Sequence, residues 1–443
     1  MVSAELTGDA AADLAVATSG DRAIGLYIHD GVAGFRARVV LVAGVAPFSS
    51  LLAADVDVDG DLDLVYSAKS FAFVGWLANA GLGASFGDAT SITEAAFGVV
   101  SVAVGDISGD SVPDMVIADT AGTTLVRGAG GGKFATPDTV TTVTAYFTGI
   151  ADVNSDGKKD IVVRQQNSLV WVRNAPQPAQ FSALGSGIVS TPRASGRPEM
   201  VVFDANADGR PDVAVARPDQ LQWQLFINRG DGTVNRVAAV DAFGAALIVA
   251  GDFDGDGDLD VALASVAPNG APSLAVFTNT DGAGGFAATS QTAVASAAEL
   301  TAAPRQLAVA DIDGSGHHDL LALFPTSVTI YSMARNGSFA PRHVTFAPPG
   351  LPVAITSLRS LSVIDVDGDG VLDLGLLADA PRAVFWTAGR GDGSFASGQL
   401  VNTSVAGAND HYIDDVAWCD FSGDGTADVV VTGRRAVPPM ANI

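Results

Sequence analysis

An acidic pattern of nine residues, D-x-[DNS]-x-D-G-x-x-D, recurs along this chain and constrains its fold more than any other feature. The clearest copy runs from Asp55 to Asp63 and is followed at once by an apolar run that begins at Leu64. Successive copies begin 46 to 59 residues apart, a period typical of arrays, solenoids and propellers. The eight clear copies begin at Asp55, Asp106, Asp152, Asp204, Asp252, Asp311, Asp365 and Asp420, and a degenerate ninth begins at Glu5.

Each unit of the repeat reads as four short β-strands. One apolar segment precedes the acidic pattern, such as Ser101–Gly105, and a second follows it, such as Met115–Ala118. A third segment comes next, such as Leu169–Arg173, and a glycine-rich turn then ends in an aromatic residue, as at Phe339. A more polar fourth segment completes the unit. Four short strands with tight turns, repeated without any long helical periodicity, predict an all-β fold, a β-propeller with four-stranded blades.

The number of blades depends on how the two ends of the chain are used. The whole chain, residues 1–443, is expected to form a single propeller domain. The ninth unit has only two strands, Asp415–Cys419 and Asp428–Val431, before the sequence ends. Because a closed propeller often pairs its two termini within one blade, which removes open sheet edges, we expect eight blades. Seven blades with extra strands, or a truncated array of nine units, are the alternatives.

Oxygen-bearing side chains at alternating positions around a glycine suit a hard cation. Within the nine-residue pattern we expect side-chain ligands at positions 1, 3, 5 and 9 and a backbone carbonyl ligand at position 7. Lys158 and His317 occupy position 7 in their copies, which supports the carbonyl there. Six or seven oxygen ligands at about 2.4 Å favour Ca²⁺ over Mg²⁺. Clusters of Cys and His that would indicate zinc or a redox metal are absent from the sequence.

The acidic pattern fits an EF-hand or a plain acidic turn less well than a calcium loop of this kind. An EF-hand needs flanking helices and a glutamate at position 12, whereas position 12 here falls in an apolar segment, for example at Tyr66 or Leu263. Dockerin-type loops and plain acidic turns remain as alternatives, but plain turns do not place Asp at position 9 in every clear copy. We therefore expect about eight structural Ca²⁺ ions, one in each clear copy. The expected ligand residues, with position 7 acting through its carbonyl, are Asp55, Asp57, Asp59, Asp61 and Asp63; Asp106, Ser108, Asp110, Val112 and Asp114; Asp152, Asn154, Asp156, Lys158 and Asp160; Asp204, Asn206, Asp208, Arg210 and Asp212; Asp252, Asp254, Asp256, Asp258 and Asp260; Asp311, Asp313, Ser315, His317 and Asp319; Asp365, Asp367, Asp369, Val371 and Asp373; and Asp420, Ser422, Asp424, Thr426 and Asp428.

The acidic pattern and the glycine-rich turn, for example Gly391 to Phe395, together resemble the FG-GAP or VCBS-type repeat. Such repeats occur in integrin α-subunit propellers and in many secreted microbial proteins. The resemblance covers almost the whole chain and implies calcium in the loop that joins the first and second strands of each blade. Two copies depart from the pattern: the first has Ala10 in place of glycine, and the second clear copy has Ser111 there. We therefore expect calcium in the eight clear copies and do not include the first copy among the expected sites.

Composition limits the partners and the compartment. The net charge is −25, and the eight clear copies contain 29 of the 49 acidic residues, so bound divalent cations would offset most of this charge. With no basic stripe to neutralise phosphates, nucleic acid is not expected as a partner.

No apolar run is long enough for membrane insertion, and no signal peptide is visible at the N-terminus. The single cysteine, Cys419, excludes an intramolecular disulfide, and we expect it to pack on a strand.

Three functions are compatible with the sequence. We favour a non-enzymatic recognition or adhesion module, outside the cell or on its surface, that binds a protein or glycan ligand, because millimolar extracellular calcium suits weak modular sites. The second candidate is a carbohydrate-active enzyme resembling polysaccharide lyases, for which His411 and Tyr412 are the only candidate acid–base residues. The third is a structural subunit of a larger extracellular assembly. The short units leave little insertion from which to build a substrate cleft, which favours the first.

Overall fold

In the described part of the chain, the computed structural model consists of β-strands and connecting turns, without helices. No helix there has the length and apolar character needed to cross a membrane. The described residues are 1–9, 11–18, 22–29, 35–44, 48–68, 73–81, 85–93, 98–165, 168–174, 181–183, 188–189, 200–217, 221–230, 234–241, 244–267, 269–286, 291–295, 299–300, 302–334, 337–344, 346, 354–380, 382–401, 411–420 and 425–435.

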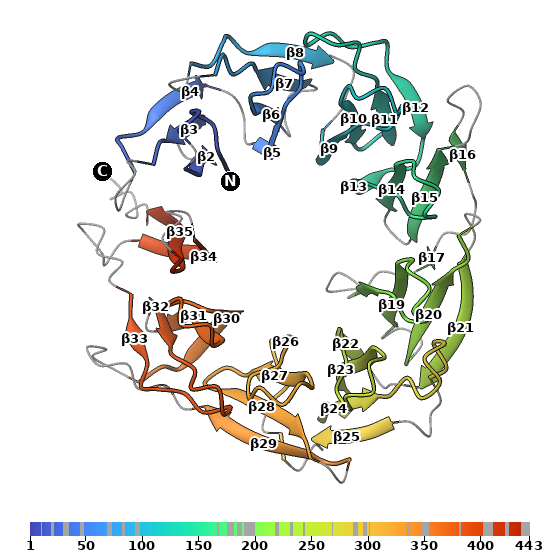
Figure 1. Ribbon diagram of the computed structural model, residues 1–443, viewed down its shortest axis with the longest axis vertical. Coiled ribbons are helices and arrows are strands. Elements are labelled where there is room, and N and C mark those ends of the chain that lie inside the picture. Colours follow the sequence, from blue (N-terminus) through green and yellow to red (C-terminus); the bar gives the residue numbers. More distant parts are fainter. Residues whose placement is uncertain are drawn as a thin grey trace, which may run out of the picture. The chain divides into compact units, whose positions relative to one another are not determined.

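The strands form successive small sheets in which spatial order follows chain order or its reverse (Figure 1). The first four sheets are β1 (Val2–Ala4), β2 (Asp13–Thr18), β3 (Ala23–Tyr27) and β4 (Val39–Ala43); β5 (Phe48–Ala54), β6 (Asp63–Ala68), β7 (Phe73–Leu77) and β8 (Thr90–Thr93); β9 (Ser101–Gly105), β10 (Asp114–Ala118), β11 (Thr123–Val126) and β12 (Asp138–Thr141); and β13 (Ala145–Ala151), β14 (Asp160–Gln165), β15 (Ser168–Asn174) and β16 (Phe181–Ala183), with β17 (Ile188–Val189) also paired to β15.

The remaining sheets repeat this arrangement, and the last one contains two strands. They are β18 (Met200–Phe203), β19 (Asp212–Arg217), β20 (Gln222–Asn228) and β21 (Val234–Asp241); β22 (Ala245–Gly251), β23 (Asp260–Val266), β24 (Pro272–Phe277) and β25 (Gln291–Ala295); β26 (Gln306–Ala310), β27 (Asp319–Leu323), β28 (Val328–Met333) and β29 (Phe339–Val344); β30 (Ser357–Ile364), β31 (Asp373–Ala380), β32 (Arg382–Thr387) and β33 (Gln399–Leu400); and β34 (His411–Cys419) with β35 (Asp428–Arg435).

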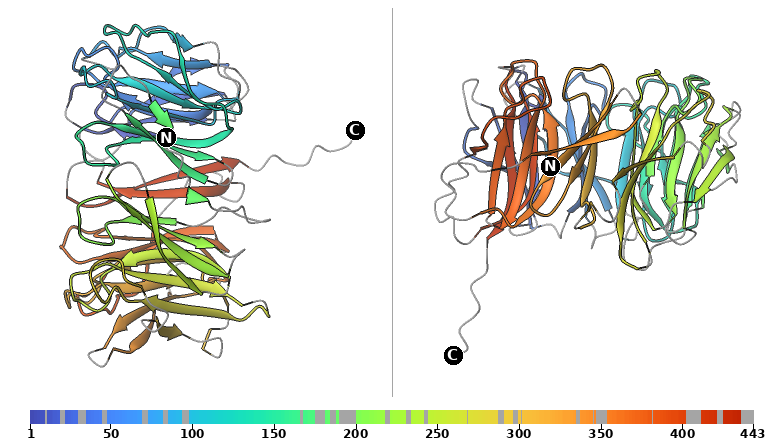
Figure 2. Two further views of the ribbon diagram at one scale, coloured as in Figure 1. Left: turned by 90° about the vertical axis from the view of Figure 1, so that its right-hand side faces the viewer. Right: turned by 90° about the horizontal axis from the view of Figure 1, so that it is seen from below.

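Neighbouring strands within a sheet are antiparallel, as the registers of β5–β6 and β6–β7 illustrate. Figure 2 shows the sheets in two further views. These small antiparallel sheets, one per sequence repeat, are the blades of a β-propeller, and the predicted all-β propeller fold is confirmed. The first unit forms a complete four-stranded sheet and the ninth a separate two-stranded sheet, so these two units do not share one sheet of described strands. The number of blades stays a prediction.

Burial changes systematically from the second strand of a sheet to the fourth. The second strands β6, β10 and β27 are buried along their whole length. Buried on both faces, such strands read as continuous apolar runs without polar alternation. The fourth strand β29 is exposed at four consecutive positions, which explains its polar sequence. The composition of each segment therefore follows its place in the blade.

The apolar cores lie between consecutive sheets. In one of them Trp223 of β20, with no exposed surface, packs edge-to-face against Phe277 of β24 and Phe286, with ring centroids 5.5 and 5.1 Å apart. Another core joins Leu26 of β3 to Leu64 and Leu77 of the next sheet. In these cores, neighbouring sheets of one compact unit bury their faces against each other, as expected for a repeat protein.

The chain forms two compact units: Met1–Ala194 with Asn228–Asn235 and Phe421–Gly423, and Ser195–Ile227 with Arg236–Asp420 and Asp424–Ile443. The expectation of a single domain stays a prediction. One expectation about packing is wrong: Cys419, the last residue of β34, is exposed. Cys419 stands at the end of β34, next to the exposed Asp420.

Candidate metal centres

The nine-residue acidic segments connect the first and second strands of the sheets, and we call each an acidic loop, named by its first residue. The Asp55 loop, for example, runs from the end of β5 to Asp63, the first residue of β6. Position 9 is likewise the first residue of β10, β14, β19, β23, β27, β31 and β35. The spacing of the pattern therefore brings position 9 to the start of the second strand while positions 1 to 8 form the turn.

The carboxylate at position 1 organises the turn by accepting backbone N–H groups. Asp55 accepts hydrogen bonds from the amides of Asp59 and Gly60, both at 3.1 Å. Asp311 does the same with Ser315 and Gly316, at 3.0 and 2.8 Å. These bonds close the loop around the carboxylate.

Positions 4 and 6 adopt left-handed backbone conformations in the loops that are described in full. At position 6, Gly60 has φ of 99°, and Ser111, which replaces glycine in the Asp106 loop, keeps φ at 67°. At position 4, Gly255 has φ of 78° while Val58 has φ of 67°. A β-branched residue is strained there. The serine departure seen in the sequence therefore leaves the shape of the Asp106 loop intact.

Position 9 is a buried structural anchor. Asp260 has no exposed surface, and its two carboxylate oxygens accept the amides of Phe253, at 3.0 Å, and Asn279, at 2.8 Å. Asp63 makes the same pair of bonds, to Val56 at 2.9 Å and Asn79 at 2.7 Å. The residue thus connects its own loop to the segment that follows the third strand. The sequence predicted a ligand at this position but not this second role.

Burial of these anchors perturbs their acidity. Burial raises the pKa of Asp63 to about 6, although the amides of Asn79 and Val56 oppose the shift. Burial likewise raises the pKa of Asp260 to about 7, against the amides of Asn279 and Phe253 and with the help of the Asp254 charge. Burial also raises the pKa of the carboxylates of Asp160, Asp319 and Asp373. Without a cation, these charges are costly to bury.

The raised pKa values predict opposite pH dependences with and without metal. A carboxylate whose pKa is higher in the folded than in the unfolded state takes up a proton on folding. Metal-free protein should therefore become more stable as pH falls from about 7 toward 4, and should lose that stability as pH rises through 6 to 7. With saturating Ca²⁺ the trend should reverse, because protons compete with the cation for the carboxylates.

Thermal unfolding between pH 5 and pH 8 checks this prediction. Protein stripped of metal and desalted is compared with the same protein in excess Ca²⁺, and the two curves of Tm against pH should lie close together near pH 5 and diverge as pH rises, with the Ca²⁺ curve above. A metal-free Tm that increases steadily over this range would contradict it.

Carboxylates from positions 1, 3 and 9 converge in four of the described loops. Within each group the nearest oxygens lie within 4.8 Å of one another: Asp55, Asp57 and Asp63; Asp252, Asp254 and Asp260; Asp311, Asp313 and Asp319; Asp365, Asp367 and Asp373. One oxygen of Asp57, Oδ1, is buried and has no hydrogen-bond partner. A cation coordinated by the group would satisfy it, so the residues present fit a bound metal ion.

The degenerate first loop retains the same convergence. Glu5, Asp9 and Asp13 lie within 4.8 Å of one another, at positions 1, 5 and 9. The hydroxyl oxygen of Thr7, at position 3, is buried without a hydrogen-bond partner, like the Asp57 oxygen at the same position. Asp13 also repeats the anchor role, accepting the amides of Leu6 at 3.1 Å and His29 at 2.9 Å. The first loop therefore has oxygen donors at positions 1, 3, 5 and 9, but its converging carboxylates are those of positions 1, 5 and 9, with a hydroxyl at position 3.

The carboxylate at position 5 has a local hydrogen-bond partner. Asp59, Asp110 and Asp369 each accept the amide of the residue two positions ahead, at 2.8 to 3.0 Å. In the Asp55 and Asp365 loops, the converging groups described above contain positions 1, 3 and 9. At position 7, Val112 and Val371 can offer only their carbonyl oxygens. Coordination of an ion by positions 5 and 7 of the clear copies stays a prediction.

In two loops an arginine side chain pairs with the carboxylate at position 5. In the Asp152 loop, the amide of Asn154 donates to Asp156 at 3.0 Å, and Arg173 forms an ion pair with Asp156 at 3.3 Å. Although burial alone would raise it, these contacts hold the pKa of Asp156 below its usual range. In the Asp204 loop, Asn206 and Arg210 contact Asp208 in the same way. A bound metal would have to compete with these partners.

The remaining candidates lie wholly or partly outside the described residues. Ser422 and Asp424 of the Asp420 loop are outside them, while Asp420 accepts the amide of Gly425 at 2.9 Å. The backbones of His411 and Tyr412 begin β34 and pair with Arg435 and Arg434, but their side chains are outside the described residues. Their proposed acid–base role stays a prediction.

The comparison with protein families identifies the repeat. The model of the FG-GAP-like repeat matches five overlapping segments, 152–215, 204–263, 252–322, 311–376 and 365–431, which together span more than half of the chain. The chain belongs to the FG-GAP-like repeat family. Each matched segment extends from one acidic loop through the next loop to the strand that follows it, so this FG-GAP-like protein repeats the loop and its supporting sheet as one unit. No curated protein is similar enough to count as a relative.

Solved structures resemble this FG-GAP-like protein along most of its length. An Agrocybe aegerita lectin that recognises non-reducing terminal N-acetylglucosamine is 16% identical, with 88% of this chain and 89% of that chain covered and a TM-score of 0.46. A functionally unknown protein from Desulfotomaculum acetoxidans is 11% identical, with 94% and 98% covered and a TM-score of 0.38. The dihydro-heme d1 dehydrogenase NirN is 10% identical, with 88% and 73% covered and a TM-score of 0.48. Similarity at this level says nothing about function.

Proposed function

We propose that this FG-GAP-like chain is a recognition module that Ca²⁺ stabilises and that works outside the cell or on its surface, where it binds a protein or glycan. The observation that carries the proposal is the convergence of carboxylates at positions 1, 3 and 9 of four of the described loops, with a buried, unpartnered oxygen in the Asp55 loop. The convergence lies at the same place in each of these four sheets, which supports a structural role for the ion.

Oxygen donors support calcium as the ion. The converging groups in the described loops contain carboxylates and neither His nor Cys. Ca²⁺ accepts six to eight such oxygens in flexible geometry, whereas Zn²⁺ prefers nitrogen and sulfur ligands and Mg²⁺ keeps several waters. When the ion is bound, its charge offsets the burial of carboxylates such as Asp260. The chain's own residues hold the loop closed around it through the backbone amides already described.

The perturbed groups support recognition over catalysis. The position-9 carboxylate of Asp260, whose pKa is raised, is engaged by two backbone amides and starts a buried strand, so it belongs to the scaffold. The sequence contains no basic stripe to neutralise phosphates, which disfavours nucleic acid as a ligand, and calcium loops of weak affinity suit the millimolar Ca²⁺ outside the cell. A protein or a neutral glycan is the ligand class that remains.

Calorimetric titration tests the proposal. Metal-free protein titrated with Ca²⁺ should bind about eight ions with dissociation constants of about 0.1 to 1 mM, the range of extracellular calcium modules. Mg²⁺ should bind at least tenfold more weakly. Glycan and protein arrays probed with and without Ca²⁺ should then show binding that needs calcium. Absence of Ca²⁺ binding, or equal array binding by metal-free protein, would overturn the proposal.

A further inference from the structure

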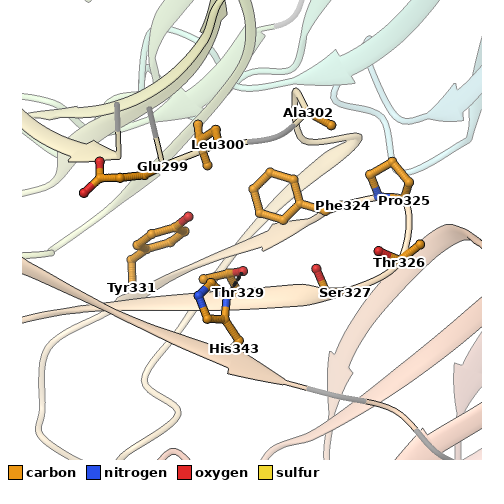
Figure 3. Close-up of a pocket in the computed structure, with 10 residues that line it drawn as sticks. All are labelled: Glu299, Leu300, Ala302, Phe324, Pro325, Thr326, Ser327, Thr329, Tyr331 and His343. Carbon is orange, nitrogen blue, oxygen red and sulfur yellow. Dashed lines mark hydrogen bonds between the residues drawn. The ribbon is translucent and has the colours of Figure 1, made fainter. Parts of the chain in front are cut away.

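A small pocket lies within the second compact unit, away from the acidic loops. It has a volume of about 220 Å³ and is formed between the segment that follows β25 and the strands β28 and β29 (Figure 3). Tyr331, Phe324 and Leu300, which line it, belong to the apolar core shared by the sheets β22–β25 and β26–β29. We call it the Tyr331 pocket.

One side of the Tyr331 pocket is a row of polar groups on adjacent strands. Thr329 and Tyr331 stand two residues apart on β28 and therefore face the same way. His343 lies directly opposite Thr329 on β29, and its Nδ1 is 3.0 Å from the Thr329 hydroxyl. Thr329 also hydrogen-bonds Tyr331. Tyr331 and Thr329 are only 3% and 2% exposed, so their hydroxyls are held in place by packing.

The charge in the pocket comes from Glu299. Burial, and then the negative charge of Glu299, raise the pKa of Tyr331 to about 12. The phenol therefore stays protonated at physiological pH and serves as a hydrogen-bonding group, which makes it unsuitable as a base for proton abstraction. The same carboxylate repels an anionic ligand.

The other side of the pocket is apolar. Leu300, Ala302 and Phe324 lie across from the row of Tyr331, Thr329 and Ser327 (Figure 3). A pocket with hydroxyl and imidazole groups on one wall, and on the other an apolar surface beside the Glu299 carboxylate, matches a molecule with both hydroxyl groups and C–H surface (Figure 3). Its volume is below the roughly 300 to 1,000 Å³ of pockets that hold drug-sized ligands, so it suits a single sugar ring and not a chain.

From this arrangement we infer that the Tyr331 pocket binds one neutral sugar unit, with Tyr331, Thr329 and Glu299 hydrogen-bonding its hydroxyls. The inference deepens the proposed recognition function and rests on it, because it names the ligand class and the site.

Ligand-observed NMR and calorimetry with methyl glycosides test the inference. The full chain, in Ca²⁺, is titrated with methyl glycosides of glucose, galactose, mannose and N-acetylglucosamine, and with methyl glucuronide. At least one neutral glycoside should bind with a millimolar dissociation constant, and methyl glucuronide should bind about tenfold more weakly.

Variants then test whether the glycoside binds in the Tyr331 pocket. Tyr331→Phe and Thr329→Val should each weaken the binding of the neutral glycoside about tenfold, the cost of one buried hydrogen bond. Tyr66→Phe is the matched control, because Tyr66 is a buried tyrosine, 2% exposed, on β6 of the other unit, and it should leave the affinity unchanged. Glu299→Gln, at an exposed position that tolerates change, should bring methyl glucuronide to the affinity of the neutral glycoside.

The outcomes separate this site from the wider proposal. Equal glycoside binding by Tyr331→Phe and the parent protein would overturn the site while leaving calcium-dependent recognition intact. Failure of every neutral glycoside to bind, with Ca²⁺ binding preserved, would overturn the sugar assignment and leave a protein ligand. Loss of both Ca²⁺ binding and array binding would mean that the proposed function itself has failed.

Discussion

Removal of Ca²⁺ is expected to lower the Tm of this protein by about 10 °C. A loop that is saturated at about ten times its dissociation constant contributes about 1.4 kcal/mol, so the eight expected calcium loops contribute about 11 kcal/mol together. A chain of 443 residues has an unfolding entropy of about 0.9 kcal/mol/K. The ratio of these two quantities sets the shift in Tm. Differential scanning calorimetry in Ca²⁺ at about ten times the dissociation constant and in excess EDTA, both near neutral pH, measures it.

The control for chelation is magnesium. Mg²⁺ added after EDTA treatment and desalting should restore little of the lost Tm, because it keeps its waters and demands near-octahedral geometry. Ca²⁺ should restore all of it. A melting curve that is the same with and without EDTA would contradict a stabilising role for the ions, whatever the loops bind.

The loops were predictable from the sequence because their signal is local. Alternating carboxylates, a glycine and a following apolar run report directly on a turn between two strands, and the structure places Asp55 to Asp63 between β5 and β6. The sequence could also have predicted that Ser111 leaves the loop shape unchanged, because an L-residue can adopt the required positive φ at a modest cost. The four-stranded sheets followed from the same repetition.

The second role of position 9 could not be predicted in the same way. The partner of Asp260 is the amide of Asn279, 19 residues away along the chain, and nothing in the acidic pattern encodes that contact. A signal was present nevertheless: Asp occupies position 9 in every clear copy, whereas position 3 varies among Asp, Asn and Ser. A ligand alone would tolerate such variation, whereas a buried carboxylate that accepts two amides would not.

The differences between loops also depend on contacts outside the pattern. Arg173 reaches Asp156 from β15, so the Asp152 loop is partly neutralised by a residue that the nine-residue pattern does not contain. The Tyr331 pocket is similar, because Thr329 and His343 meet only through the register of β28 and β29. Repetition therefore predicts the scaffold, and the non-repeated residues that decide specificity become visible only in three dimensions.

Asp260→Ala is expected to destabilise the protein by about 3 to 5 kcal/mol and to remove one Ca²⁺ from the stoichiometry. The substitution leaves the amides of Phe253 and Asn279 buried without an acceptor, at about 1 to 3 kcal/mol each. It also removes one of the three converging carboxylates of the Asp252 loop. Unfolding by urea in Ca²⁺, followed by tryptophan fluorescence, measures the free energy of unfolding, and calorimetric titration counts the ions.

Two variants separate the roles of this carboxylate. Asp258→Ala, at position 7 of the same loop, should change the free energy of unfolding by less than about 0.5 kcal/mol and keep the Ca²⁺ count, since Lys158, Val112 and Val371 fill that position in other loops.

Asp260→Asn keeps an oxygen acceptor without a charge. In EDTA it should therefore be more stable than Asp260→Ala, because its one oxygen still accepts one of the two backbone amides. In Ca²⁺ the Asn variant should be less stable than the parent protein, because a neutral amide is a weaker calcium ligand. If the Ala and Asn variants were equally stable in EDTA, the amide-anchoring role of position 9 would be refuted, and only its role as a ligand would remain.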